Sequence, residues 1–289
     1  MSELSSGFVA TVIGTSGAWS SIRERLARRG LTVAQPRGID SLLRSLETGR
    51  PEIIAAHHES TKKEVQTRAN EIVRLSAETG LLRKFVNWFK IHRLRSEIDC
   101  LYTTDAAFPV VIDADIAMVR ELLGSAELKG AEAELSVIEK LRKLPEYAVV
   151  FNDVQLRADR HIYFDGAALQ SAQIDHLVLM PAGVFVIETK YWSRRSVESG
   201  VFHDPFDQLR RANYLCYDSL RRAFGKTSVR SVIVNFGYLP DAPPNSYVKV
   251  VRPDRLVGYL RRFTDAGMTL EKMASINSFF EVRTPSRGT

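Results

Sequence analysis

Apolar residues in the second half of the chain fall into short runs typical of buried strands, and these runs alternate with segments of helical period. The predicted order is helix 131–144, strand 147–156, strands 174–180 and 184–192, helix 204–224, strands 229–235 and 247–251, and helices 254–263 and 269–279. Strands interleaved with helices in this way are typical of a mixed sheet covered by helices. We therefore expect an α/β fold for this half.

The first half of the chain has a different pattern. Its start predicts a small α/β segment, with strands at 8–14 and 31–34 and helices at 19–29 and 39–46. From Pro51, apolar residues recur at helical spacing as far as Gly80, and a proline is well tolerated in the first turn of a helix. A helical region is therefore expected to begin at Pro51.

A second long helix is predicted after Gly80, and together the two form a helical hairpin. Its apolar stripe consists of Leu81, Leu82, Phe85, Trp88, Phe89 and His92. Residues at this spacing share one side of a helix, so we expect the stripe to pack against a neighbour rather than to stack on bases. A strand at 108–112 and a helix at 116–123 complete the first half.

Glycines at positions 124 and 130 mark the predicted boundary between the two halves. The expected organisation is a small α/β segment at 1–50, a helical region at 51–128 and a larger domain at 129–289. The helical region is a candidate surface for a homo-oligomer or for a partner protein.

Composition narrows the class of protein. With 45% hydrophobic and 26% charged residues in a chain of 289, extensive disorder is not expected. Two cysteines exclude a disulfide scaffold, so we expect a cytoplasmic location. The start of the chain does not have the pattern of a signal peptide, and 18 consecutive apolar residues occur nowhere, so no membrane partner is expected.

Positive charge is concentrated between positions 190 and 230. This stretch contains nine Lys or Arg residues and four Asp or Glu residues. Such an excess favours binding to a polyanion through phosphate contacts, although a solvated helix surface is the more common explanation for a run of this kind.

The segment QIDHLVLM–PAG–VFVIETK predicts a β-hairpin that carries charged residues at its open end. A turn centred on Ala182 would place Asp175 opposite Thr189. Glu188 and Lys190 are two residues apart, so their side chains leave the same face of their strand. The hairpin is therefore expected to bring Asp175, Glu188 and Lys190 within reach of one another.

Charged groups on strands this apolar are costly unless they are paired or bind a cation. Carboxylate oxygens suit Mg²⁺ or Mn²⁺, and a neighbouring lysine can hold a phosphate oxygen and stabilise the charge that develops during phosphodiester attack. A purely structural Asp–Lys–Glu cluster is the alternative explanation. The residue types and spacing favour chemistry.

The longer segment QIDHLVLMPAGVFVIETKYW resembles the core motif of the NERD (nuclease-related) domain, a branch of the PD-(D/E)XK nuclease superfamily. The flanking segments GAEAE from 130, FNDV from 151 and PFDQ from 205 agree with the same family. The resemblance differs at Ala133, where the family usually has glycine, and in the loop after Lys190, which reaches Gly200 late.

The resemblance implies a restriction-endonuclease-like fold and a role for each matched residue. Asp175 and Glu188 would be metal ligands, joined by the backbone carbonyl of Thr189, and Lys190 would be the catalytic lysine. Glu134 would be the helix carboxylate and Gln208 the polar residue from the helix after the hairpin.

The helical phase of Glu134 supports its place in the site. Glu134 shares the apolar side of its helix with Ile138 and Leu141, where an unpaired carboxylate would be costly. A favourable interaction with the helix dipole is the alternative. On the next helix, Asp204 is a predicted cap, Pro205 is expected in the first turn, and Gln208 follows in the second turn.

The candidate contacts to nucleic acid are Arg194, Arg195, Arg210 and Arg211, with Arg221 and Arg222 further along the same helix. His176 points to the opposite face from Asp175, so it is expected to be a buried core histidine. The loop from Gly14 to Gly17 lacks the spacing and the lysine of a phosphate-binding loop, so a plain turn is favoured over a nucleotide site.

The expected function is Mg²⁺-dependent (or Mn²⁺-dependent) hydrolysis of phosphodiester bonds in nucleic acid, with DNA favoured over RNA. The alternative is a catalytically silent nucleic-acid-binding or scaffolding protein that uses the same fold. The sequence leaves strandedness and the choice between endo- and exonucleolytic cleavage open.

Overall fold

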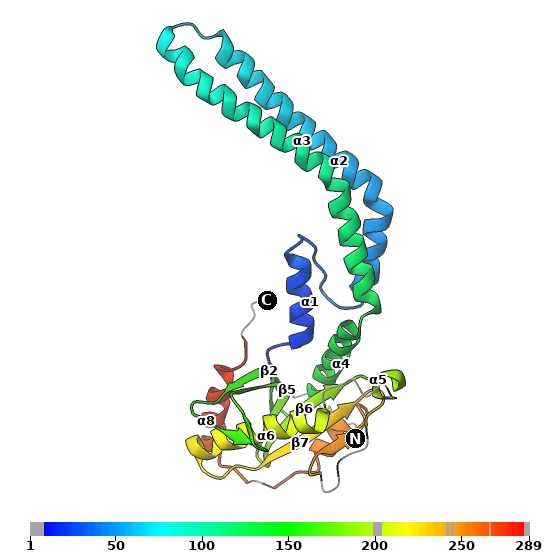
Figure 1. Ribbon diagram of the computed structural model, residues 1–289. Coiled ribbons are helices and arrows are strands. Elements are labelled where there is room, and N and C mark those ends of the chain that lie inside the picture. Colours follow the sequence, from blue (N-terminus) through cyan, green and yellow to red (C-terminus); the bar gives the residue numbers. More distant parts are fainter. Residues whose placement is uncertain (1–8, 199–203, 241–242, 244–245, 266, 286–289) are drawn as a thin grey trace, which may run out of the picture. The chain divides into compact units, whose positions relative to one another are not determined.

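The computed structural model describes residues 9–198, 204–240, 243, 246–265 and 267–285 (Figure 1). The chain forms two compact units, one made of Met1–Thr32 with Ser125–Thr289 and the other of Val33–Gly124. This division differs from the predicted one, because the start of the chain joins the C-terminal part rather than forming a segment of its own. The hairpin of long helices is inserted between them in the sequence.

The larger unit is built on a six-stranded mixed sheet with the order β1-β2-β5-β6-β7-β8. The strands are β1 Thr11–Ile13, β2 Val149–Arg157, β5 Ser171–Met180, β6 Gly183–Lys190, β7 Val229–Asn235 and β8 Lys249–Val251. The β2/β5 and β5/β6 pairs are antiparallel, and the β1/β2, β6/β7 and β7/β8 pairs are parallel. A separate two-stranded ribbon joins β3 Tyr163–Phe164 to β4 Ala167–Ala168.

The helices of this unit are α1 Gly17–Ala27, α4 Ala126–Leu141, α5 Arg194–Glu198, α6 Pro205–Phe224, α7 Leu256–Leu260 and α8 Leu270–Glu281. Four of them, α4, α6, α7 and α8, cover the two faces of the sheet. Leu177 and Val186 pack with α6 and α8 in one core, whereas Val178 and Ile187 pack with α4 and α7 in the other. Because neighbouring residues of β5 and β6 enter different cores, both strands are apolar at almost every position. The predicted mixed α/β sheet flanked by helices is confirmed.

The β5–β6 hairpin has a different register from the predicted one. Met180 pairs with Gly183 and His176 pairs with Ile187, so Pro181 and Ala182 form a two-residue turn. Gly183 has a φ of 134°, a backbone conformation that favours glycine. The same register continued to the open end places Asp175 opposite Glu188 rather than opposite Thr189.

The N-terminal segment adds an edge strand to the sheet. Thr11 and Ile13 of β1 pair with Val149 and Phe151 of β2. The observed strand is shorter than the predicted range of 8–14, and Phe8 lies outside the described residues. The predicted strand at 31–34 is wrong, because these residues form no regular element.

The smaller unit is a hairpin of two long helices, α2 Gly38–Ala77 and α3 Leu81–Gly124. The predictions that a helix begins at Pro51 and that 108–112 is a strand are both wrong, since Pro51 and Pro109 lie inside these helices. Ile112, Ile116 and Val119 are buried at helical spacing, so packing between the helices outweighs the local strand preference.

Candidate functional site

Asp175 and Glu188 lie side by side at the open end of the β5–β6 hairpin. Directly opposed residues of antiparallel strands project from the same face, and Lys190 follows on that face two residues after Glu188. This is the face that α6 covers, and Gln208 lies in the second turn of α6. Glu188 is buried, whereas Asp175, Lys190 and Gln208 are half-buried.

Lys190 is held between two partners. Its Nζ lies 2.6 Å from Oε1 of Glu188 and donates a hydrogen bond of 3.0 Å to Oε1 of Gln208. The backbone N–H of Thr189 donates to Oδ2 of Asp175 at 2.7 Å. The predicted group of Asp175, Glu188, Lys190 and Gln208 is therefore brought together in the fold.

Glu134 approaches the same site from α4. Its Oε2 accepts a hydrogen bond of 2.7 Å from Oγ of Ser16 and one of 3.4 Å from the backbone N–H of Ala18. Ser16 is buried and also caps α1 by accepting from the N–H of Trp19 at 2.9 Å. A serine at a helix start was visible in the sequence, but nothing in it indicated a contact across more than a hundred residues.

Burial raises the pKa values of these carboxyl groups, and the charge of Asp175 adds to the rise at both glutamates. Burial raises the pKa of Glu188 to about 8, and the Asp175 charge adds to the rise, while Lys190 and Gln208 oppose it. Burial also raises the pKa of Glu134 to about 8, with further contributions from Asp175 and Glu188. The pKa of Asp175 is raised mainly by burial, against the hydrogen bond from Thr189 and the charge of Lys190. A bound cation would relieve this concentration of acids.

The site opens into a cavity of about 400 Å³. Its walls come from α1, α4, β5, β6 and α6, and they include Glu134, Asp175, Glu188, Lys190 and Gln208. The N-terminal segment contributes Gly17, Ala18 and Ser21 to one wall. The walls are mostly polar, as a site for a hydrated ion and a phosphate group would require.

A divalent cation fits the donor atoms that are present. In the described part of the chain, no three His, Cys, Asp or Glu side chains form a ready-made metal cage. Mg²⁺ is commonly held by one or two carboxylates that are completed by water and substrate phosphate, so a complete protein cage is not needed. Asp175 and Glu188 are the residues that could supply those carboxylates.

His176 lies behind the site on the opposite face of β5, as predicted. It is fully buried, with Nδ1 2.7 Å from Oδ1 of Asn152 and Nε2 3.1 Å from Oγ1 of Thr189. Burial lowers the pKa of His176 to about 3, so the ring is neutral. A neutral histidine with two polar partners supports the backbone of Thr189 from behind.

The arginines predicted to bind nucleic acid lie outside the lining of this cavity, as far as the structure describes it. Arg194 pairs with Glu198 at 2.7 Å, and Arg210 pairs with Asp165 and Asp207 at 3.0 Å each. Arg195 is exposed and Arg211 is half-buried. Their contacts with nucleic acid remain a prediction.

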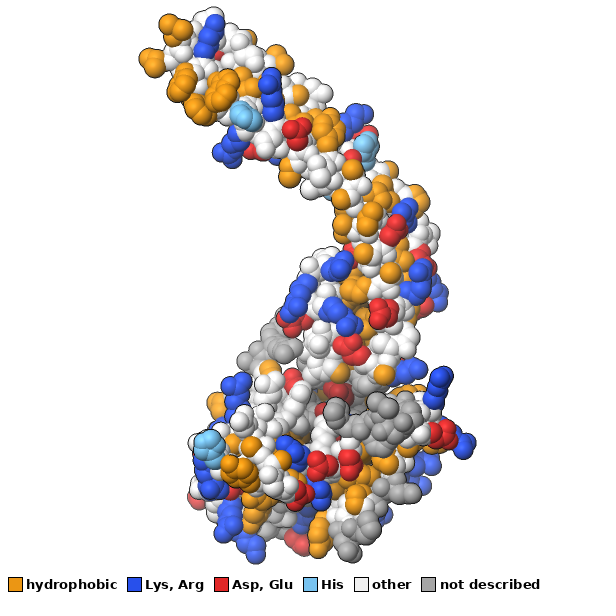
Figure 2. All heavy atoms as spheres, in the orientation of Figure 1, with side chains coloured by type: hydrophobic (Ala, Val, Ile, Leu, Met, Phe, Trp, Pro, Cys, Tyr) orange, Lys and Arg blue, Asp and Glu red, His pale blue; other side chains and the backbone are white. Residues whose placement is uncertain are grey.

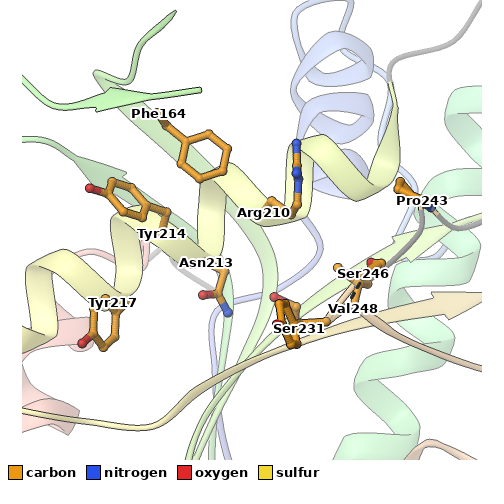
Figure 3. A pocket seen from close by; sticks show the side chains of 10 residues that line it. Phe164, Arg210, Asn213, Tyr214, Tyr217, Ser231, Pro243, Ser246 and Val248 are labelled. Carbon is orange, nitrogen blue, oxygen red and sulfur yellow. Dashed lines mark hydrogen bonds between the residues drawn. The ribbon is translucent and has the colours of Figure 1, made fainter. Parts of the chain in front are cut away.

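Arg210 belongs to a separate pocket of about 330 Å³ on the other flank of α6. Figure 3 shows it with Phe164, Asn213, Tyr214 and Tyr217 around the hollow. Its guanidinium lies 5.7 Å from the centre of the Phe164 ring. Residues 208 and 210 project from opposite sides of a helix, so Arg210 is directed away from the cavity that Gln208 lines.

Comparison with solved structures gives one distant likeness. The structure of protein VC1899 from Vibrio cholerae is similar over 58% of this chain and 37% of that one, at 15% identity and with a TM-score of 0.29. This chain thus matches little more than a third of that protein's length, and the likeness is too distant to bear on fold or function. None of the curated proteins compared with the chain matches it.

A family model gives a stronger result. Residues 129–236 match the family described as NERD, the nuclease-related domain. The matched segment begins in α4 and ends just after β7, so it contains Glu134, Asp175, Glu188, Lys190 and Gln208. It does not contain β1, α1 or the helical hairpin. Residues 129–236 of the chain are therefore similar to the nuclease-related domain of the NERD family.

Proposed function

We propose that this protein hydrolyses phosphodiester bonds in DNA and that the reaction requires Mg²⁺ or Mn²⁺ held at Asp175 and Glu188. The observation that carries this proposal is the placement of two acids and one lysine on the same face of the hairpin, at the floor of an open polar cavity. Groups with pKa values this perturbed are typical of sites that do chemistry.

Lys190 is the residue that we assign to the phosphate group. Its ammonium has three N–H donors, and Glu188 and Gln208 account for two of them. Within the described residues the third donor has no hydrogen-bond acceptor, so we assign it to a phosphate oxygen, where a positive charge stabilises the additional negative charge of the transition state. Gln208 holds the ammonium in place, because its carbonyl oxygen accepts from the same nitrogen.

Asp175 and Glu188 are the proposed cation ligands, with the backbone carbonyl of Thr189 as a third. When bound, the divalent cation supplies Lewis acidity and makes a coordinated water a better nucleophile at neutral pH. The N–H of Thr189 fixes the orientation of the Asp175 carboxylate. Glu134, held by Ser16, is the residue that we assign to hydrogen bonding with the attacking water.

A titration of Mg²⁺ and Mn²⁺ tests the proposal with fluorescently labelled DNA and RNA of matched sequence. We expect cleavage of DNA that increases with either metal and stops when the metal is chelated. Binding, measured by anisotropy in the same tubes, should persist after chelation. Cleavage of RNA alone would contradict the choice of substrate.

The alternative function is binding of nucleic acid without cleavage. The contact of 2.6 Å between Lys190 Nζ and Glu188 Oε1 supports it, because it gives one buried acid a polar partner without a metal. In that case the titration would show binding at every metal concentration and no product at any. Such a result would assign the protein to a binding or scaffolding role.

A further inference from the structure

The end of the helical hairpin carries an exposed apolar surface. We define the tip patch as Leu81, Leu82, Phe85, Val86, Trp88 and Phe89, which begin α3 directly after the turn. Leu81 is 91% exposed and Leu82 is 85% exposed. Figure 2 shows apolar side chains gathered at this end of the hairpin. The prediction that the apolar stripe of this helix packs against a neighbour is therefore wrong, and the exposure of these side chains requires another explanation.

The first turns of α3 bury one polar side chain and expose several apolar ones. Asn87 is buried against α2, where its Nδ2 donates to the backbone oxygen of Leu75 at 3.0 Å. Leu81, Phe85 and Trp88 follow one another at helical spacing on the outer side. A helix in contact with water normally has its apolar side inward and its polar side outward. The apolar side chains on the outer side of these turns therefore have no covering partner among the described residues.

Basic residues surround the tip patch. The segment 81–96 contains Arg83, Lys84, Lys90, Arg93 and Arg95 and has no Asp or Glu. Arg93 pairs with Glu97 at 3.0 Å. For the other four, the described residues include no acid within ion-pair distance. Lys90 interacts with the charge of Glu71 on α2, and Asn87 donates to Glu78 at 3.3 Å. The tip thus combines exposed aliphatic and aromatic side chains with several cations that form no ion pair among the described residues.

We propose that the tip patch binds the surface of a lipid bilayer that contains anionic lipids. Trp88, Phe85 and the two leucines would enter the boundary between head groups and acyl chains, where tryptophan and other apolar side chains are favoured. The surrounding cations would lie among the lipid phosphates. The observations that carry this inference are independent of the nuclease site.

Two other occupants fit the tip less well. Nucleic acid would satisfy the cations and stack on aromatic rings, but it offers no apolar surface to Leu81 and Leu82. A second copy of the hairpin, docked tip to tip, would bring like charges together. An anionic bilayer satisfies both features at once.

The proposed contact lies on a bilayer and does not cross it. In the described part of the chain, no helix has the length and apolar content that a bilayer crossing requires. The expectation of no membrane partner rested on the lack of such a helix, and a surface contact needs none.

Vesicle flotation with the full chain tests the inference, in a buffer with chelator so that no cleavage intervenes. We expect binding to equimolar phosphatidylcholine and phosphatidylglycerol, weak binding to phosphatidylcholine alone, and loss of binding at high salt. Leu81→Ser with Leu82→Ser should abolish flotation. Arg83→Gln with Lys84→Gln should lower the partition coefficient on the order of tenfold.

Matched controls come from the same two helices. Val110→Ser with Val111→Ser removes two exposed apolar residues of α3, and Lys62→Gln with Lys63→Gln removes two exposed cations of α2. Both control variants should float like the wild type. Vesicles should also shift tryptophan emission to shorter wavelength in the wild type and not in Trp88→Phe, which reports on insertion directly.

Several outcomes would overturn the inference. One is a wild-type protein that floats with neither vesicle. Another is a Leu81→Ser, Leu82→Ser variant of normal helix content that floats like the wild type. If the tip substitutions instead dissociate an oligomer, a second copy covers the patch. If they weaken DNA binding and leave flotation unchanged, nucleic acid does.

Discussion

The contact between Ser16 and Glu134 links the start of the chain to the proposed catalytic centre. Ser16 is buried and serves two purposes, since its hydroxyl donates to Glu134 and accepts from Trp19. Because the hydroxyl fixes one carboxyl oxygen of Glu134, its removal should affect the site as well as the stability of α1.

Ser16→Ala should lower the free energy of unfolding by about 1–2 kcal/mol, the usual effect of losing a helix cap or a buried hydrogen bond. It should also slow DNA cleavage. Thr269→Ala is the matched control, because Thr269 caps α8 by accepting from Lys272 at 3.2 Å and does not line the cavity that contains Asp175 and Glu188. Denaturant titration and a cleavage assay on both variants provide the measurement. Equal cleavage rates for the two would contradict a positioning role for Ser16.

The acids of the site also predict how stability depends on pH. Glu134 and Glu188 have pKa values raised from 4.5 to about 8, so the fold favours their protonated forms. The two protonated glutamates therefore contribute to the stability of the fold. This contribution is complete below pH 4.5 and is lost as the pH rises through about 8. His176, with its pKa lowered from 6.5 to about 3, has the opposite effect, but only below about pH 6.5.

The interval from about pH 6.5 to 8.5 therefore reports on the acids rather than on His176. In chelator, the melting temperature should fall across this interval. Mn²⁺ should restore it, and the increase caused by Mn²⁺ should be larger at the higher pH, because metal binding requires ionised carboxylates. Glu188→Gln should reduce both effects. A Mn²⁺ effect that does not change with pH would argue against these acids as the binding site.

Among the elements that line the cavity, α1 begins at Gly17, which is itself a lining residue. A Cβ atom on Gly17 would lie 2.7 Å from Oδ1 of Asp153 and 3.1 Å from Nε2 of Gln173. Asp153 has a φ of 57°, which is uncommon for a residue other than glycine, so its backbone has little freedom to adjust. The helix can start at this place because residue 17 has no side chain.

Gly17→Ala should therefore destabilise the protein by about 1–3 kcal/mol through overpacking. Gly130→Ala is the control, since Gly130 lies inside α4 with open space around the added Cβ. That substitution should stabilise by up to about 1 kcal/mol, because alanine favours helices. Thermal melts of the two variants should move in opposite directions, and a shift of the same sign would contradict the described packing.

The sequence predicted the sheet and the residues of the site well where the signal is local. Apolar runs located β2, β5, β6 and β7 to within a few residues, and the hairpin motif brought Asp175 and Glu188 together. The register was wrong by one residue, because the centre of the Pro181–Ala182 turn is not fixed by its composition. The roles of the site residues remain predictions.

Contacts between distant parts of the chain could not be predicted in this way. The continuous helices through Pro51 and Pro109 depend on packing between α2 and α3, which overrides the local preference of each proline. The place of β1 beside β2 depends on a pairing of residues more than a hundred positions apart. Periodicity contains no information about either.

For the whole molecule, the division into two units predicts that the larger unit folds without the helical hairpin, residues 33–124. Arg25 near the end of α1 pairs with Glu127 at the start of α4 at 3.0 Å, so a short Gly/Ser linker can join residues 32 and 125. This shortened protein should keep the melting temperature and the cleavage activity of the full chain. It should lose vesicle binding, because the tip patch is gone.

Deletion of residues 1–32 should have the opposite result. It removes the edge strand β1 and the Ser16 contact to Glu134, so both stability and cleavage should fall. The family-matched segment begins at residue 129 and would be intact in both deletions. Equal activity in the two would show that the N-terminal segment is dispensable for the site.

Cleavage of labelled DNA in Mn²⁺ by wild type, Asp175→Ala and Lys190→Ala, purified side by side, addresses the assignment of the catalytic centre. Asp175→Ala removes a proposed metal ligand, and Lys190→Ala removes the positive charge proposed to contact the phosphate. Either loss should slow cleavage on the order of a thousandfold, which corresponds to about 4 kcal/mol of barrier. DNA binding should be largely retained in both variants. We predict product from the wild type and almost none from either variant. Equal rates in all three, or no product from the wild type at any Mn²⁺ concentration, would contradict the assignment of Asp175, Glu188 and Lys190 as the centre of a nuclease.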